Sequence, residues 1–552
     1  MSTDANKAPS SGSTAGLFLR KSSGLVRAFS VFDGFTYSVY AVSPVLAAAL
    51  TYMLVSPWHD ANIPLGIVFV CLGFLPMFTI YAMMSTLMPR AGGDYVWQSR
   101  AFSGIVGYIM TFTPIVVSAW FYTASNLFIT PMLTAPTFIA LGTILNSPAL
   151  VKFGSWLSTT NGMFALYVVY IVYASILLSL GMRVYARVQR WSFWIGFAGV
   201  LTWGLMLLIT TQTQFIQSFN SFMANTLGWG GGNAYQQMLD MAKAGGFEAV
   251  PLSQTKILPS FLIGPVLAYT FMALAWTGTL VGEIGGLNQF KNSMRIYLGA
   301  NFFCMIMCAV FIWLLISKVG NEFFTSANFL IFSGASSAMP VAPYYSIFLM
   351  ALTKNPWLWL WIAIGLNAWF WIWPVNGFVG STRVMFAMSY DRMLPAALAK
   401  VYGRWAVPLW AILACFIGSL IFGYLYFYTA FAKLTLDVIL VLLVCFGVST
   451  LAGTLMPYLK VTKRLYYDSP ISKYKLGKVP AITIVGALAE VYIVISLYLY
   501  ITDPRYGVNS LLSAVFILAM VVASAVIYFI YKWYRRREGI NTDLTYKEIP
   551  TD

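Results

Sequence analysis

The chain has 552 residues, of which 59% are hydrophobic and only 9% are charged. A soluble globular protein carries about 25% charged residues because its surface faces water. The composition therefore excludes a soluble multidomain protein and predicts an all-α polytopic membrane protein. The net charge of +16 would suggest a nucleic-acid partner in a soluble protein, so the position of the basic residues relative to the membrane spans decides its meaning.

A transmembrane helix needs about 20 predominantly apolar residues, and runs of this kind predict twelve transmembrane helices. In chain order they cover residues 29–54, 62–87, 102–132, 162–181, 191–211, 259–283, 295–318, 357–389, 406–428, 431–457, 481–502 and 508–531. A further apolar stretch, 326–353, contains Pro340 and Pro343. We expect it to form a cap on the outer side of the bundle rather than a thirteenth span.

The basic residues predict the orientation of these spans. Most of them fall in the two tails and in the connections on the same side, and the opposite side has only Lys152, Lys243, Lys256, Lys318, Lys354, Lys433 and Arg505. Because basic residues are retained in the cytoplasm, we expect a multi-pass protein of the cell membrane with both termini inside. Residues 1–28 are expected to form a disordered cytoplasmic tail, 212–258 an extracellular loop and 532–552 a cytoplasmic C-terminal tail. The positive charge is then a signal of topology, and no nucleic-acid partner is predicted.

The first predicted span contains a Ser-Pro pair near its middle. Proline lacks the backbone N–H of a helix interior, and the residue before it is biased away from helical angles. Ala41, Val42, Ser43 and Pro44 therefore predict either two half-helices, the second beginning at Pro44, or an ordinary kink in which Ser43 bonds back to its own helix. A helix that begins within the membrane would present its positive end to a carboxylate.

The sixth predicted span carries a similar signal. It follows Gly264-Pro265, and the stretch from Tyr269 to Thr279 is rich in small residues and threonine, which tolerate an unwound segment. Interruptions in the first and sixth spans are what a five-plus-five inverted repeat would produce around a substrate site.

Two segments of the sequence resemble the amino acid–polyamine–organocation (APC) superfamily. One leads into the third span and contains Gly92-Gly93-Asp94-Tyr95, followed by Arg100-Ala101. The other ends the eighth span and runs from Ser381-Thr382-Arg383 through Ala387-Met388 to Asp391 and Leu394-Pro395. The connections after the fourth and sixth spans are more weakly similar. Together the matching segments and their order extend over about residues 28–535.

The resemblance implies a leucine-transporter-type fold with broken helices 1 and 6. Residues 29–211 would form the first inverted repeat, 259–457 the second, and 458–531 two peripheral spans. The implied partner is a small amino acid or amine, moved across the lipid bilayer by alternating access. The implied substrate-binding residues are Ala41, Val42, Ser43, Pro44, Ser118, Tyr122, Tyr269, Phe271, Met272, Ala273, Leu274, Ala275, Trp276, Asn376 and Gly377.

The sequence departs from the family pattern at two of these sites. The usual glycines of the first span are replaced by Ala41 to Pro44, and an acid common in the sixth span of relatives is replaced by Ala275. Because a dibasic substrate would lose its partner there, we expect a neutral and hydrophobic amino acid. A polyamine, organic cation or nucleobase transporter of the same fold, or a non-transporting membrane sensor, is the alternative.

Ionisable residues within a membrane are functional candidates, and this chain has few. Asp33 and Glu283 lie at the predicted cytoplasmic ends of spans one and six, where they could pair with Arg100, Arg383 or Arg295 as an inner gate, or be wet from the cytoplasm. Glu490 is the deepest acid, and its peripheral span favours a paired structural role. No enzyme activity, metal or cofactor is expected, H⁺ and Na⁺ both stay open as coupling ions, and the sequence predicts no oligomeric state.

Overall fold

The computed structural model of the chain describes residues 25, 27–125, 129–402 and 406–548. In these ranges the chain is almost entirely helical, and the only strands are the two-residue pair β1 (Lys475–Leu476) and β2 (Val479–Pro480). Twelve segments of the described residues are long and apolar enough to cross a membrane. The chain is therefore an all-α, multi-pass membrane protein, as its composition predicts.

The twelve candidate spans match the twelve apolar runs of the sequence, and several are built from more than one helix. The first contains α1 (Val31–Val42) and α2 (Pro44–Leu54), the second is α3 (Ile63–Leu87), and the third begins with α5 (Gly104–Thr111), the π-helical η1 (Phe112–Val117) and α6 (Ser118–Ser125). The fourth and fifth are α9 (Thr160–Ser179) and α10 (Met182–Ile209). The sixth contains α13 (Ile257–Leu262), α14 (Gly264–Phe271) and the 3₁₀ segment η5 (Met272–Glu283).

The second half of the chain supplies the other six. The seventh is α15 (Phe290–Val319), the eighth contains α18 (Pro356–Phe370) and α19 (Trp373–Tyr390), and the ninth is α20 (Leu409–Tyr428). The tenth contains η8 (Ala430–Leu434) and α21 (Thr435–Leu455), and the last two are α23 (Ala481–Thr502) and α24 (Leu511–Arg537).

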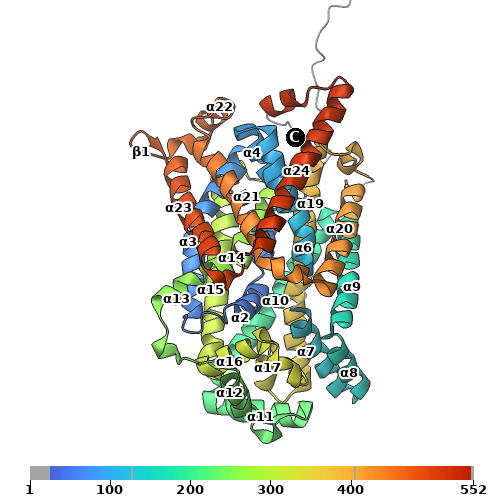
Figure 1. Cartoon of the computed structure of the whole chain (residues 1–552), viewed down its shortest axis with the longest axis vertical. Helices are drawn as coiled ribbons and strands as arrows, with labels where there is room; N and C mark the ends of the chain where they lie inside the picture. The colour runs from blue at the N-terminus through green and yellow to red at the C-terminus, as the bar shows by residue number, and fades with distance from the viewer. Residues whose placement is uncertain (1–24, 26, 126–128, 403–405, 549–552) are drawn as a thin grey trace, which may run out of the picture.

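Shorter helices cover the two ends of this bundle (Figure 1). At the end where the first span finishes they are α7 (Ile129–Ile144), α8 (Pro148–Trp156), α11 (Gln212–Leu227), α12 (Ala234–Ala244), α16 (Asn321–Phe332) and α17 (Tyr345–Ala351). At the other end are α4 (Gly93–Ala101), α22 (Lys463–Tyr467) and the 3₁₀ turn η11 (Thr542–Lys547). The apolar stretch 326–353 thus forms parts of two short helices packed on α12, α2 and α7, and it adds no span.

The first, tenth and sixth spans are the most buried of the bundle, and most of the eighth is buried as well. Helix α1 contacts η5, α10, α15 and α19, and nine of its twelve residues, from Asp33 to Val42, are buried. It begins with a capping box: the Ser30 hydroxyl accepts from the Asp33 N–H, and the Asp33 carboxylate accepts from the Ser30 N–H. Outer helices such as α23 and α24 instead expose many aliphatic side chains, which a lipid environment satisfies.

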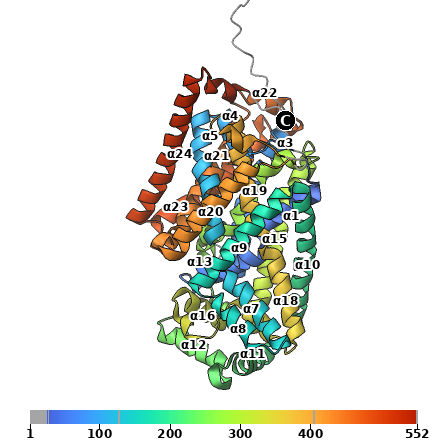
Figure 2. The ribbon, with the colours of Figure 1, turned by 90° about the vertical axis from the view of Figure 1, so that its right-hand side faces the viewer.

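The predicted C-terminal tail is a folded part of the structure. Helix α24 continues to Arg537 along one flank of the bundle (Figure 2), beside α5 and η1. Glycine at 539 then reverses the chain with a φ of 75°, and η11 packs on α4. Tyr546 of η11 is only 7% exposed, because it fills a space over Gly104, where a Cβ would overlap its ring.

Candidate functional site

The first span is interrupted at Ser43. Helix α1 ends at Val42 and α2 begins at Pro44, and Ser43 between them has a φ of 47°. This positive φ lies in the left-handed region, which residues other than glycine rarely adopt. The Ser43 hydroxyl is buried without a hydrogen-bond partner among the described residues, so it neither caps α2 nor bonds back to α1. The Ser43 main-chain N–H still donates to the Val39 carbonyl at 2.7 Å, so the two interpretations of the sequence, two half-helices or a kink, both stay open.

The sixth span changes its helix type rather than losing it. The α-helix α14 ends at Phe271, and the chain continues as the 3₁₀ helix η5 to Glu283. A 3₁₀ run longer than three or four residues is uncommon, and its hydrogen bonds are poorer than those of an α-helix. One buried contact joins the two central spans: the Ser38 and Thr277 hydroxyls lie 2.7 Å apart. No pattern in the sequence indicates this pair.

Asn376 ties the eighth span to the first. Its amide nitrogen donates to the Tyr37 carbonyl at 3.1 Å, and its carbonyl oxygen accepts from the Tyr185 hydroxyl. The Tyr37 hydroxyl in turn donates to the Asn376 main-chain carbonyl at 3.2 Å. In this conformation the Asn376 side chain is occupied by contacts within the protein.

Most of the other predicted binding residues are buried in the bundle. Ala41, Val42, Ser43, Ser118, Phe271, Met272, Ala273, Leu274, Ala275 and Trp276 are all 3% exposed or less. Ser118 donates to the Thr113 carbonyl one turn back, and Gly377 lies beside Thr123. The side chain of Tyr122 lies outside the described part of the structure. The structure thus brings most of the predicted residues together and leaves little space between them.

One of the predicted binding residues, Tyr269, lines a cavity. The cavity has a volume of about 860 Å³ and lies at the α16–α17 end of the bundle, between the end of α2 and the start of α21. Its lining is largely apolar, and the described residues around it include one basic side chain, Lys433, and no acid. It occupies the end of the bundle opposite Glu283.

The opposite end is closed by a buried ion pair between the sixth and eighth spans. Arg383 of α19 contacts Glu283, the last residue of η5, through Nε–Oε1 at 2.6 Å and Nη2–Oε2 at 3.0 Å. Both side chains are 2% exposed. A bidentate pair of this kind is geometrically specific, and it holds the ends of two central spans together. In this conformation Glu283 is therefore buried and paired, and its carboxylate is not exposed to solvent.

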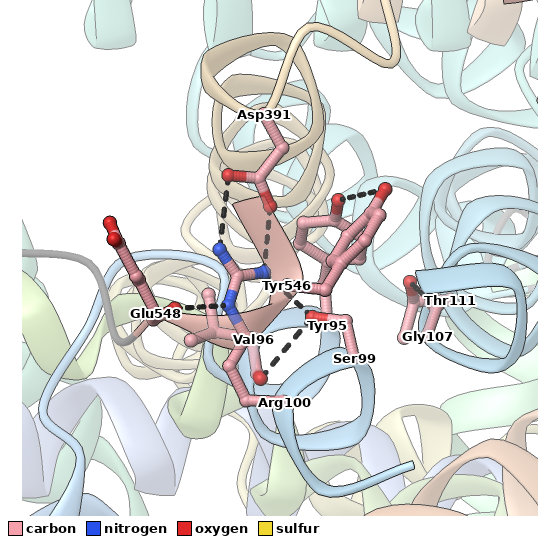
Figure 3. Close-up of polar contacts among 9 residues, drawn as sticks. All are labelled: Tyr95, Val96, Ser99, Arg100, Gly107, Thr111, Asp391, Tyr546 and Glu548. Carbon is pink, nitrogen blue, oxygen red and sulfur yellow. Dashed lines mark hydrogen bonds and ion pairs between the residues drawn. The ribbon is translucent and has the colours of Figure 1, made fainter. Parts of the chain in front are cut away.

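A second buried ion pair links α4 to the residue that follows α19. Arg100 contacts Asp391 through Nη1–Oδ2 at 2.7 Å and Nη2–Oδ1 at 3.1 Å. Figure 3 shows the C-terminal segment folded over this pair, with Arg100 Nε donating to the Glu548 carbonyl at 3.2 Å and the Tyr546 ring beside the guanidinium. The Tyr546 and Tyr95 hydroxyls lie 3.4 Å apart. The sequence identified Arg100 as a gate candidate, but neither its partner Asp391 nor its cover Tyr546.

Asp33 and Glu490 have different surroundings from those expected. Asp33 pairs with Arg190, whose Nε lies 2.8 Å from its Oδ1 and whose side chain is half exposed, rather than with Arg100, Arg383 or Arg295. The Oε1 atom of Glu490 is buried without a hydrogen-bond partner among the described residues, so the expected pairing is not formed there. The sequence alone could not predict these surroundings, because the side chains around each acid come from other helices.

A buried carboxyl group that the sequence did not single out lies on α4. Asp94 is 0% exposed and accepts hydrogen bonds at Oδ1 from the Tyr81 hydroxyl at 2.5 Å and from the Ser449 hydroxyl at 2.7 Å. Its Oδ2 atom has no hydrogen-bond partner among the described residues. Helix α4 precedes the third candidate span, and burial raises the pKa of this carboxyl to about 6. The only signal in the sequence was its position in the Gly-Gly-Asp-Tyr segment.

Comparison with known proteins does not assign the chain to a family. No protein-family model matches the chain, and no curated protein is significantly similar to it. Among the described residues, no group of three or more His, Cys, Asp or Glu side chains is placed to hold a metal ion.

Proposed function

We propose that the protein is a secondary active transporter that moves neutral, hydrophobic amino acids across the cell membrane by alternating access, with both termini in the cytoplasm. The proposal takes the chain as a member of the APC superfamily with two inverted repeats. The observation that carries it is the arrangement of the central spans, in which the Ser43 interruption and the 3₁₀ segment η5 lie between an open cavity and a closed, ion-paired end.

Alternating access requires that one end of the bundle be open while the other is closed. The cavity beside Tyr269 satisfies the first requirement, and the Glu283–Arg383 and Arg100–Asp391 pairs satisfy the second. The interruption at Ser43 supports a substrate site at the same level, because the backbone N–H groups that begin α2 have no side-chain cap. Such a helix terminus suits the carboxylate of an amino acid.

The lining of the cavity supports an amino acid over a polyamine or an organic cation. A cationic solute would be attracted by a carboxylate at the entrance, whereas the described residues that line the cavity include Lys433 as their only charged side chain. Leu50, Met53 and Met163 contribute an apolar wall, which favours an aliphatic or aromatic side chain on the substrate.

Counterflow in proteoliposomes tests this function without assuming a coupling ion. The purified protein is reconstituted with unlabelled leucine inside, and entry of labelled leucine is measured with external leucine, phenylalanine, alanine, arginine, a polyamine or a nucleobase as competitor. We expect saturable entry that the neutral amino acids inhibit most strongly. Stronger inhibition by arginine or the polyamine would reject the proposed specificity, and absence of counterflow with every solute would favour a sensor.

Two substitutions then test the assigned site. Tyr269→Ala removes the aromatic wall of the cavity and is expected to raise the KM for leucine by at least about tenfold, the effect of losing ~1.4 kcal/mol of binding. Tyr506→Ala, which also removes a cavity aromatic but lies outside the predicted site, is the matched control and should change the KM much less. Equal effects of both substitutions would reject the assignment of Tyr269.

A further inference from the structure

The free oxygen of Asp94 faces η5. A Cβ placed on Gly278 of η5 would lie 3.2 Å from Asp94 Oδ2 and 3.2 Å from the Trp97 ring. The backbones meet here because both positions are glycine: a Cβ on Gly93 would overlap the Gly278 carbonyl. The close approach of α4 to the sixth span therefore excludes solvent from Asp94 Oδ2.

A short hydrogen-bonded chain fixes the rest of this carboxyl group. Ser449 of α21 donates to Asp94 Oδ1 and accepts from Gln98 Nε2 at 2.8 Å, while Gln98 Nε2 also donates to the Cys445 carbonyl at 2.9 Å. Tyr81 of α3 supplies the second donor to Oδ1. Asp94 is thus held by α3 and α21 on one side and lies against η5 on the other.

No basic side chain compensates the charge of Asp94. The elements that contact α4 carry Tyr108 on α5, the Glu283–Arg383 pair on η5 and α19, Tyr390 on α19, Asp437 and Cys445 on α21, and Asp543, Tyr546 and Lys547 on η11. Helix α4 itself carries Tyr95 and the Arg100–Asp391 pair, Arg90 precedes it, and Tyr81 and Cys71 of α3 and Tyr297 of α15 complete the set. Among the described residues, no ion pair includes Asp94, and Arg100 and Arg383 hold the carboxylates of Asp391 and Glu283. A buried carboxylate without a cation is costly, and the group neutralises by binding a proton instead.

We propose that Asp94 is a proton-binding site that links protonation to the opening of the ion-paired end of the bundle. While α4 lies against η5, the carboxyl group holds its proton up to about pH 6. When this end opens and η5 moves away from α4, water reaches Oδ2 and the proton is released. The inference goes beyond the proposed transport activity and rests on it only for its consequence, which is that the inward-open state is reached with release of a proton into the cytoplasm.

Linkage gives the size of the effect. Asp94 has a higher proton affinity in the closed state than a hydrated carboxyl, whose pKa is about 3.9. Between the two pKa values, each increase of one pH unit therefore raises the ratio of open to closed protein by up to tenfold. With the closed-state pKa at about 6, the open fraction rises about a hundredfold in total as the pH increases from about 4 to above 6.

Infrared difference spectroscopy of the purified protein tests the proton site without any substrate. Wild-type protein is expected to lose a protonated carboxyl band as the pH is raised through about 6. Asp94→Asn should abolish this band when it is combined with Glu490→Gln, which removes another poorly paired acid on α23. Glu490→Gln alone is the matched control and should retain the band of Asp94. Tyr81→Phe removes a hydrogen bond that favours the charged form, so the midpoint should shift to higher pH. Persistence of the band in the Asp94→Asn, Glu490→Gln double variant would overturn the inference.

Distance measurements between spin labels test the link to opening. Labels at Asn288, just after η5, and at Ser103, between α4 and α5, report the separation of the two elements. In wild type a longer distance should gain population as the pH rises through the same range, whereas Asp94→Asn should keep the short distance throughout. A pH-dependent distance in Asp94→Asn, or its absence in wild type, would overturn the linkage. Neither readout needs transport, so a failure of leucine counterflow alone would reject only the proposed function.

Discussion

The buried pair between Glu283 and Arg383 allows a quantitative test of how one end of the bundle is closed. Glu283→Gln leaves Arg383 as a buried charge without a counterion, and Arg383→Gln does the same to Glu283, since both side chains are 2% exposed. Removing one partner of a buried pair typically costs 3–5 kcal/mol. We therefore expect each single variant to lose about 3–5 kcal/mol of unfolding free energy.

The double variant separates the interaction from its context. With both charges removed, no charge is left uncompensated, and we expect a loss about 2 kcal/mol or more smaller than the sum of the single losses. Unfolding free energies in detergent micelles, measured by denaturant titration, give the coupling energy. Lys256→Met, which breaks an ion pair whose lysine is 70% exposed, is the control and should cost at most about 1 kcal/mol.

A purely additive double variant would refute this reasoning. It would show that the two charges are hydrated or otherwise compensated in solution, and that the ion pair does not hold η5 to α19. Single losses no larger than that of Lys256→Met would lead to the same conclusion.

Three further outcomes are expected from the structure. Ser43→Gly relieves a positive φ and should stay within about 1 kcal/mol of wild type, whereas Ser43→Val should lose about 2 kcal/mol, both measured by denaturant unfolding, and equal losses would contradict the strain argument. Gly104→Val displaces the Tyr546 ring, so trypsin should cleave the C-terminal segment of this variant at least about tenfold faster than that of the control Tyr546→Phe, which keeps the ring. Equal cleavage rates in the two variants would contradict the packing of Tyr546 on Gly104. The folded pKa of Asp94, about 6, lies above the unfolded value. The resulting stabilisation of the folded state is therefore complete below about pH 4, and ~3 kcal/mol of it is lost as the pH rises through 6. The unfolding midpoint measured against pH should show this loss in wild type and not in Asp94→Asn. The same pH profile in both proteins would refute the assignment to Asp94.

The spans were predictable because each is a local property of the chain. A run of about 20 apolar residues is stable in the bilayer whatever its neighbours, so residues 62–87 and 481–502 predicted α3 and α23 with boundaries within one residue. The irregular points were partly predictable for the same reason. The Ser43-Pro44 pair disrupts a helix through its own covalent chemistry, and the structure changes helix there.

Charge partners and burial were decided by the tertiary structure. The sequence named Arg100 and Arg383 as gate residues, but only the packing of α4 and η5 against α19 determined that Arg383 takes Glu283 and Arg100 takes Asp391. The same packing buries Asp94 without a cation and folds Tyr546 back onto α4. Hydropathy and local helix chemistry thus determined which segments span the membrane, whereas contacts between residues hundreds of positions apart determined which charges are compensated, because those depend on distances in space that no local pattern records.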